Sequence, residues 1–231
     1  MSERLYDYFH PLLAEYTPLT IKLNSTCSVF EELELAEFFS QEESKAIIDM
    51  NKVYASTLYK RSCGNPLFTH SLRVAIWLHA CGCNEKIVSL GAYHDFLEDM
   101  CSSFKEYEEK YSLVPQNFIQ EVLVLTNRFT FLYKYAKKNK LSKEEFLKEL
   151  DDLRNSKVFA DCINEVYELI SNGDIEQFGQ EAYSLYLEQL IDFYESRNKE
   201  DVILIKLIDR IDNTLSDMPS PLTANAKIEM N

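Results

Sequence analysis

The sequence predicts an all-α fold. Only 5 Gly and 6 Pro occur in 231 residues, and long stretches carry Leu, Ile, Phe, Glu and Lys at helical spacing. With 46% hydrophobic residues the chain can bury a sizeable core, and its length suits one domain with an insert. The expected helices cover residues 40–60, 70–81, 85–100, 116–138, 142–154, 156–170, 181–196 and 201–216.

Capping signals delimit the first three of these helices. Ser40 and Glu43 form a capping box, in which each side chain bonds to the backbone N–H of the other residue. Thr69 is expected to cap the second helix, and Gly82 to end it. Asn84 is expected to cap the third.

The later helices rest on similar signals. Pro115 stands at the start of the fourth, and Ser142 with Glu145 forms a second capping box that opens the fifth. Glycines separate the sixth from the seventh. The last segment reads Val-Ile-Leu-Ile-Lys-Leu-Ile-Asp-Arg-Ile, a run that could also form a buried strand. Its continuation through Asp209 and Asp212 at helical spacing favours a buried helix.

Charge and composition restrict the class of partner. A net charge of −14 argues against nonspecific nucleic-acid binding, which needs a basic surface. A phosphorylated small molecule stays compatible, because a bound metal changes the local charge. No run of about 18 apolar residues is present, so no membrane span is expected. The six cysteines lack a zinc-type spacing, and the first residues lack a signal-peptide pattern, so we expect reduced thiols and a cytoplasmic protein.

Imidazole and carboxylate side chains fall at helical spacing in the third helix. His94 and Asp95 begin the set. Glu98 and Asp99 follow one turn later, so that one helix can present two adjoining polar edges to a single cavity. Asp209 lies in an otherwise apolar segment. Because an unpaired buried charge costs several kcal/mol, its carboxylate needs a partner, and a metal is one.

Taken one at a time, these residues have ordinary structural explanations. His70 alone is more often a satisfied polar residue at a helix start, and Asp209 beside Arg210 more often forms a structural ion pair. Two acids at a helix end are usually solvated. The ordered set favours a functional site, because one His, a His-Asp pair with two further acids, and a distant Asp occur together.

Three segments resemble the hydrolase domain of the RelA/SpoT homologues, which belong to the HD phosphohydrolases. Residues 61–70, Arg-Ser-Cys-Gly-Asn-Pro-Leu-Phe-Thr-His, are similar to Arg-x-Ser-Gly-Glu-Pro-Tyr-Ile-x-His of that family. Residues 94–99, His-Asp-Phe-Leu-Glu-Asp, are similar to its His-Asp-x-x-Glu-Asp signature. Residues 202–213, Val-Ile-Leu-Ile-Lys-Leu-Ile-Asp-Arg-Ile-Asp-Asn, are similar to Val-Ile-Leu-Ile-Lys-Leu-Ala-Asp-Arg-Leu-His-Asn. The resemblance covers roughly residues 45–135 and 186–217.

The resemblance implies an HD-domain helical bundle and a stand-alone alarmone hydrolase. Such an enzyme binds one manganese ion and removes the 3′-pyrophosphate of the nucleotides ppGpp and pppGpp, leaving GDP or GTP. The implied metal ligands are His70, His94, Asp95 and Asp209. Two imidazoles and two carboxylates suit a divalent metal of borderline hardness, such as manganese or iron. The pair Glu98 and Asp99 would orient and deprotonate the attacking water.

The resemblance also implies substrate contacts. Arg61 would stack on the guanine, as suits a planar guanidinium, and Asn213 would contact the nucleoside. Lys206 and Lys134 are also expected to bind the substrate. One departure is Asp212, which stands where the family has His and is expected to make the nucleotide edge more acidic.

The implied domain organisation is a single HD domain over residues 1–231. Its parts are a core at about 40–135 and 186–217, a helical insert at about 136–185 before the last core helix, and a tail at 218–231. In the insert, an apolar face is expected to pack on the core of the same chain, with a second copy or another protein as the alternative; its residues are Phe146, Leu147, Leu150 and Leu153. The lysine-rich residues 133–140 at its entrance are either a solvated helix face or a lid that gathers phosphates.

Two other functions remain open. The chain can be an HD phosphohydrolase that acts on another nucleotide, such as NADPH or a 5′-nucleotide. It can also be a non-catalytic HD-fold binding module that acts on a protein partner through the insert. The intact set of ligands and water-activating acids favours an enzyme, because a binding module has no chemical need for them.

Overall fold

The structure is a computed structural model that describes residues 38–55, 67–197 and 200–216. Of this part of the chain, 79% is helical and none forms a strand, which confirms the predicted all-α class. The described residues form two compact units, one with 38–55, 67–93 and 204–216 and the other within 94–203. No helix in these ranges is both long enough and apolar enough to cross a membrane.

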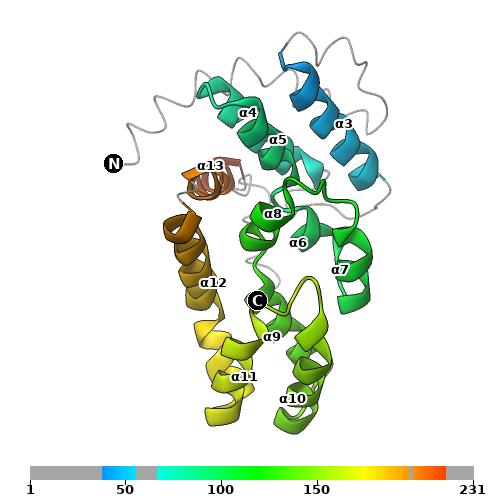
Figure 1. The fold of residues 1–231 in the computed structure, drawn as a ribbon, viewed down its shortest axis with the longest axis vertical. Helices are drawn as coiled ribbons and strands as arrows, with labels where there is room; N and C mark the ends of the chain where they lie inside the picture. Colours follow the sequence, from blue (N-terminus) through cyan, green and yellow to red (C-terminus); the bar gives the residue numbers. More distant parts are fainter. Residues whose placement is uncertain (1–37, 56–66, 198–199, 217–231) are drawn as a thin grey trace, which may run out of the picture. The chain divides into compact units, whose positions relative to one another are not determined.

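The first unit is built on three helices and most of a fourth. These are α3 (Gln41–Ala55), α4 (Phe68–Ala80), α5 (Glu85–Tyr93) and the part of α13 (Glu200–Ser216) that starts at Leu204. Helix α5 packs on α3 and α4, as Figure 1 shows. Gly91 permits the close approach to α4, because a Cβ at this position would lie 2.5 Å from Cδ1 of Leu78.

Three of the four capping signals in this unit are confirmed. In the capping box, the N–H of Ser40 donates to Oε2 of Glu43 at 2.8 Å, and the N–H of Glu43 donates back to Oγ of Ser40. Asn84 caps α5 through its side-chain oxygen, and Gly82 takes the left-handed conformation with φ 74° after α4. Thr69 was wrongly predicted as a cap. Helix α4 begins one residue earlier, and Thr69 is a buried residue of its first turn.

The predicted helix over 85–100 is wrong in one respect, because it is interrupted at His94 and Asp95. Helix α5 ends at Tyr93, and the short α6 (Phe96–Met100) begins after a turn. The backbone of Asp95 has φ −97° and ψ 3°, outside the helical region, and its carbonyl accepts the first hydrogen bond of α6 from Asp99. The four polar residues are therefore not on one straight helix.

The second unit contains seven helices in its described residues. They are α6, α7 (Phe104–Tyr111), α8 (Ile119–Leu125), α9 (Arg128–Lys138), α10 (Lys143–Asp152), α11 (Ile163–Asn172) and α12 (Ile175–Arg197). Helix α7 was not predicted. The predicted helix over 116–138 is two helices, because the side chain of Asn127 caps α9 by accepting from the N–H of Thr130 at 3.0 Å.

The helices that were assigned to the insert pack within this unit. The second capping box, Ser142 with Glu145, is confirmed at the start of α10. As predicted, Phe146 and Leu150 are fully buried, and the ring of Phe146 lies 6.3 Å from that of Phe178 in α12. Helix α12 packs beside α9 (Figure 1). It starts at Ile175 rather than near 181, and α11 starts at 163 rather than 156.

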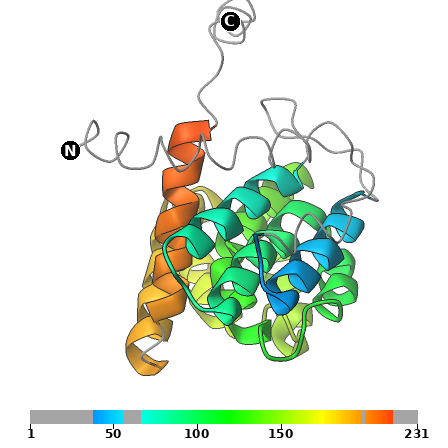
Figure 2. The same ribbon diagram turned by 90° about the horizontal axis from the view of Figure 1, so that it is seen from above.

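The last helix, α13, settles the choice between strand and helix. Residues 200–216 are continuously helical, and their apolar residues Val202, Ile205 and Ile208 are buried. Figure 2 shows α13 as one helix beside α4, to which its Asp212 is hydrogen-bonded. The single-domain organisation with an insert at 136–185 stays a prediction, because the two compact units divide the chain at other positions, after Tyr93 and after Ile203.

Candidate metal centre

His70 occupies the first turn of α4 and is fully buried. Its two ring nitrogens face two carboxylates of α13. The Nε2 atom lies 3.0 Å from Oδ1 of Asp209, and the Nδ1 atom lies 2.7 Å from Oδ2 of Asp212. The two aspartates are three positions apart on the helix, so they share a face that is turned toward α4.

Asp212 accepts hydrogen bonds from three side chains of α4. Arg73, one turn after His70, donates to it twice, from Nε at 2.8 Å and from Nη2 at 2.9 Å. Nε1 of Trp77 donates at 3.4 Å. Burial by itself would raise the pKa of Asp212, but the hydrogen bonds from His70 and Arg73 outweigh burial and hold this pKa well below its ordinary value. Asp212 is therefore an ionised acceptor.

This ionised carboxylate fixes the proton of His70. An ionised carboxylate only accepts hydrogen bonds, so Nδ1 of His70 carries the proton and donates it to Asp212. In neutral imidazole, Nε2 then presents its lone pair to Asp209. Metal-binding histidines are commonly oriented in this way by a carboxylate behind them. In that neutral form, Nε2 and Oδ1 of Asp209, which lie 3.0 Å apart, could both donate electron pairs to one cation.

Asp209 is held by its own helix. Nζ of Lys206 lies 2.7 Å from Oδ2 of Asp209, and Nδ2 of Asn213 donates to Oδ1 at 2.6 Å. These partners lie three positions before and four positions after Asp209, where helical geometry places neighbours. The buried carboxylate, which is 2% exposed, therefore has the partners that burial requires.

His94 and Asp95 form the turn that directly follows α5. His94 is fully buried, and its Nε2 lies 3.2 Å from Oδ1 of Asp95, which is partly exposed. In the structure, His70, His94, Asp95 and Asp209 each offer one ligand atom, and these atoms all lie within 4.8 Å of one another. The group can hold a metal ion.

The donor set fits a divalent transition metal. Two imidazole nitrogens and two carboxylate oxygens suit a cation of borderline hardness, and they do not select one element. Arg73 neutralises Asp212 and Lys206 neutralises Asp209. Asp95 adds a third carboxylate, so the site favours a cation.

Four other site residues predicted from the sequence are not among the four that offer these ligand atoms. Glu98 is exposed on α6, and its Oε2 accepts from the backbone N–H of Asn127 at 3.2 Å. Asp99 is partly exposed on the same helix. Lys134 is exposed on α9 and lines a pocket of the second unit. Arg61 lies outside the described residues. The roles predicted for these four side chains in catalysis or substrate binding stay predictions.

Sequence reasoning missed the group around Asp212. This residue was expected to make a nucleotide-binding edge more acidic, which stays a prediction; the structure shows that it is 1% exposed and paired with Arg73. Arg73 and Trp77 were not singled out at all. Their spacing from His70, three and seven positions along α4, was the available signal, because it places all three on one helix face.

Fold and site together define an all-α protein with a candidate metal centre. Comparisons with protein-family models, with curated proteins and with solved structures find no match to this chain. Its function is therefore argued from the site.

Proposed function

We propose that the chain is a metal-dependent phosphohydrolase of the HD type that removes the 3′-pyrophosphate of ppGpp and pppGpp. The observation that supports this proposal most directly is the group formed by His70, His94, Asp95 and Asp209, whose ligand atoms lie within 4.8 Å of one another. The resemblance of the three sequence segments supplies the substrate. Manganese is the metal that we propose, at one ion per chain.

A bound divalent metal would lower the pKa of a water molecule and offset the charge of phosphoryl oxygens. Within the chain, Asp212 keeps the ring of His70 in one orientation with Nε2 presented to the site. Lys206 and Asn213 hold the carboxylate of Asp209, and we propose that they do so in addition to their expected substrate contacts. These side chains are already held in position, so they need little rearrangement during the reaction. Positioning and electrostatic stabilisation by groups held in this way supply most of the acceleration of phosphoryl transfer.

Glu98 and Asp99 are the proposed catalytic acids. One of them accepts a proton from the attacking water while the other orients it. The water oxygen forms a bond to the phosphorus that carries the ribose O3′, and the bond between this phosphorus and O3′ breaks. O3′ takes up a proton, and pyrophosphate leaves.

We also propose that the protein works in a reducing compartment, the cytoplasm. The described cysteines Cys81, Cys83, Cys101 and Cys162 are free thiols. Burial raises the pKa of the last two to about 12, so these thiols stay protonated and unreactive.

Metal analysis and a nucleotide panel test the function together. Protein loaded with manganese should contain about one metal per chain and release pyrophosphate from ppGpp. Asp209→Ala should lose both metal and activity, because it removes a ligand. Glu98→Gln should keep the metal and lose turnover, because it removes only a proton acceptor.

The same panel, with NADPH and 5′-nucleotides included, separates the alternatives. Turnover of another nucleotide in place of ppGpp would retain the phosphohydrolase chemistry and replace the substrate. Full activity in metal-free protein, or no turnover of any nucleotide by protein that holds the metal, would overturn the proposal.

A further inference from the structure

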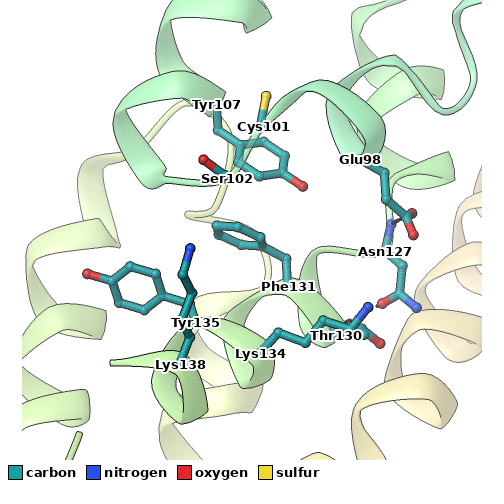
Figure 3. Close-up of a pocket in the computed structure, with 10 residues that line it drawn as sticks. All are labelled: Glu98, Cys101, Ser102, Tyr107, Asn127, Thr130, Phe131, Lys134, Tyr135 and Lys138. Atoms are coloured by element: carbon teal, nitrogen blue, oxygen red, sulfur yellow. Dashed lines mark hydrogen bonds between the residues drawn. The ribbon is translucent and has the colours of Figure 1, made fainter. Parts of the chain in front are cut away.

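The second unit contains a pocket of about 210 Å³ against one side of α9. We propose that this pocket binds a pyrophosphate-sized anion through Lys134 and Lys138. The inference deepens the proposed function, because the lining includes Glu98, a proposed catalytic acid, and Lys134, a predicted substrate contact. It is tested by binding without metal or turnover, so its failure and the failure of the proposed hydrolysis can be told apart. Figure 3 shows the pocket with the residues that line it.

Of the lysines Lys134, Lys137 and Lys138 on α9, one is paired with a carboxylate of α12 and the two that line the pocket are not. Lys137 forms an ion pair with Glu176 of α12, and the hydroxyl of Tyr133 donates to the same carboxylate. Lys134 and Lys138, which line the pocket, have no ion-pair partner within the described part of the chain. They stand four positions apart, where like charges on a helix repel. A bound anion between them would relieve this repulsion in a protein whose net charge is otherwise −14.

Other donors border the same space. The side chain of Asn127 uses its oxygen to cap α9, which leaves its NH₂ group as a donor, and the hydroxyl of Thr130 lies one turn from Lys134. Glu98 is the carboxylate in the lining. It accepts from the N–H of Asn127, and Figure 3 shows it at the end of the pocket away from Lys138. The Lys134 side chain runs toward Thr130 and Asn127, the side on which Glu98 lies, and Lys138 lies on the opposite side, so an anion bound by both lysines would span the pocket (Figure 3).

Aromatic rings give the pocket a fixed wall. The ring of Phe131 lies 4.6 Å from that of Tyr107, and the ring of Tyr135 lies 4.2 Å from that of Phe104. Tyr107 is fully buried. Packed rings of this kind hold α9 in place, so both lysines are attached to a rigid support.

The volume sets the size of the ligand. The pocket has a volume of about 210 Å³. This space admits a phosphate or pyrophosphate group, but it is below the range of about 300 Å³ and more that larger ligands occupy. The ligand is thus either the free anion or the diphosphate group of a larger molecule whose remainder stays outside the pocket.

Titration calorimetry with inorganic pyrophosphate, on the full chain in metal-free buffer, tests the proposal. We expect one saturable site whose dissociation constant rises with salt, because ammonium and phosphate groups carry the interaction. The variant with both Lys134→Ala and Lys138→Ala should bind at least about tenfold more weakly. Lys137→Ala is the matched control and should bind as the parent chain does, since its ammonium group is engaged by Glu176.

Two further experiments test where the anion binds and which molecule carries it. Thr130→Leu keeps the charge, removes a hydroxyl donor and puts a bulkier apolar side chain into the pocket, so it should also weaken binding. A nucleoside diphosphate that competes with pyrophosphate would identify the diphosphate group of a larger molecule as the ligand, whereas no competition would identify the free anion. If Lys137→Ala weakens pyrophosphate binding as much as the double variant does, the binding depends on general surface charge and not on this pocket. That result, or no saturable binding of either ligand, would overturn the proposal.

Discussion

Replacing Asp212 by Asn tests whether this carboxylate positions the candidate metal ligand His70. The change keeps the size of the side chain but replaces one acceptor oxygen by an NH₂ group. In the native chain, Oδ2 faces Nδ1 of His70 and Nη2 of Arg73, and Oδ1 faces Nε of Arg73. Whichever way the amide turns, its NH₂ group meets a donor. His70 or Arg73 must then change its arrangement.

Two energies follow from this geometry. Loss of a partner behind a metal-binding histidine lowers metal affinity by about 10- to 100-fold. That factor corresponds to about 1.4 to 2.7 kcal/mol of binding free energy. Folding is affected as well, because Arg73 stays charged and buried without its carboxylate partner. Breaking a buried pair costs about 3 to 5 kcal/mol. We expect about 3 kcal/mol for Asp212→Asn, the lower end, because Arg73 has further contacts.

Metal affinity and stability are measured separately. Competition with a chelator of known affinity gives the dissociation constant for manganese or zinc under conditions where the variant is folded, as circular dichroism verifies. Urea unfolding without metal gives the free energy of unfolding. Trp77→Phe is the packing control, because it removes the longest bond to Asp212, at 3.4 Å, and part of a buried ring. It should lower the free energy of unfolding but change metal affinity by less than about threefold.

One result would refute the reasoning about Asp212. If folded Asp212→Asn binds metal as tightly as the parent chain, His70 does not depend on this carboxylate for its orientation. Equal losses in Asp212→Asn and Trp77→Phe would point to a general loosening of α4, and the specific role of Asp212 would be wrong.

Three other predictions concern separate parts of the chain. Arg61→Ala should raise the KM for ppGpp and Arg61→Lys should rescue it poorly, because lysine has no planar group to stack on guanine; unchanged KM in both variants would remove that role. Arg128 is fully buried and donates to the carbonyl of Val158. Arg128→Met should therefore lower the free energy of unfolding, measured in urea, by about 1 to 3 kcal/mol. The control Lys137→Ala, which breaks an exposed ion pair, should lower it by less than about 1 kcal/mol. Burial raises the pKa of Cys162 to about 12, so a thiol reagent at neutral pH should modify Cys162 only after unfolding, as peptide mass analysis can show. The Cys162 thiol has a higher pKa in the folded chain than its ordinary value of 9.0, so its contribution to the free energy of unfolding is complete below pH 9.0. This contribution is lost as the pH rises toward 12, because the unfolded chain then loses the thiol proton first.

Short-range signals in the sequence determined where several helices begin. The boxes at Ser40 and Ser142 and the cap at Asn84 each join residues three positions apart, so the chain needs no tertiary contact to form them. The helical class follows from periodicity over ten or more residues. The apolar face of α10 was predicted to be buried for the same reason, and Phe146 is buried as expected.

Interruptions of helices were not readable from the same patterns. Helical periodicity runs through His94 and through Asn127 without a break, yet a turn occurs at each. At Asn127 the local cap to Thr130 was a usable signal. At Asp95 no side-chain cap bond accompanies the turn, so the local sequence offers little to predict it.

The sequence named the four residues that form the candidate metal group through the resemblance of its segments to the hydrolase domain, in which their chemical types and order are those of metal ligands. Only the tertiary structure brought Asp212 behind His70 and set Arg73 against it. These residues are 142 and 139 positions apart in the chain. A pattern within one helix cannot specify which residues of a distant helix it will meet, since that pairing is decided by how α4 and α13 pack. The same holds for the pocket beside α9, where Lys137 is neutralised by Glu176 and Lys134 is not. Identical side chains on one helix thus differ in their partners, because the rest of the fold places different groups opposite them.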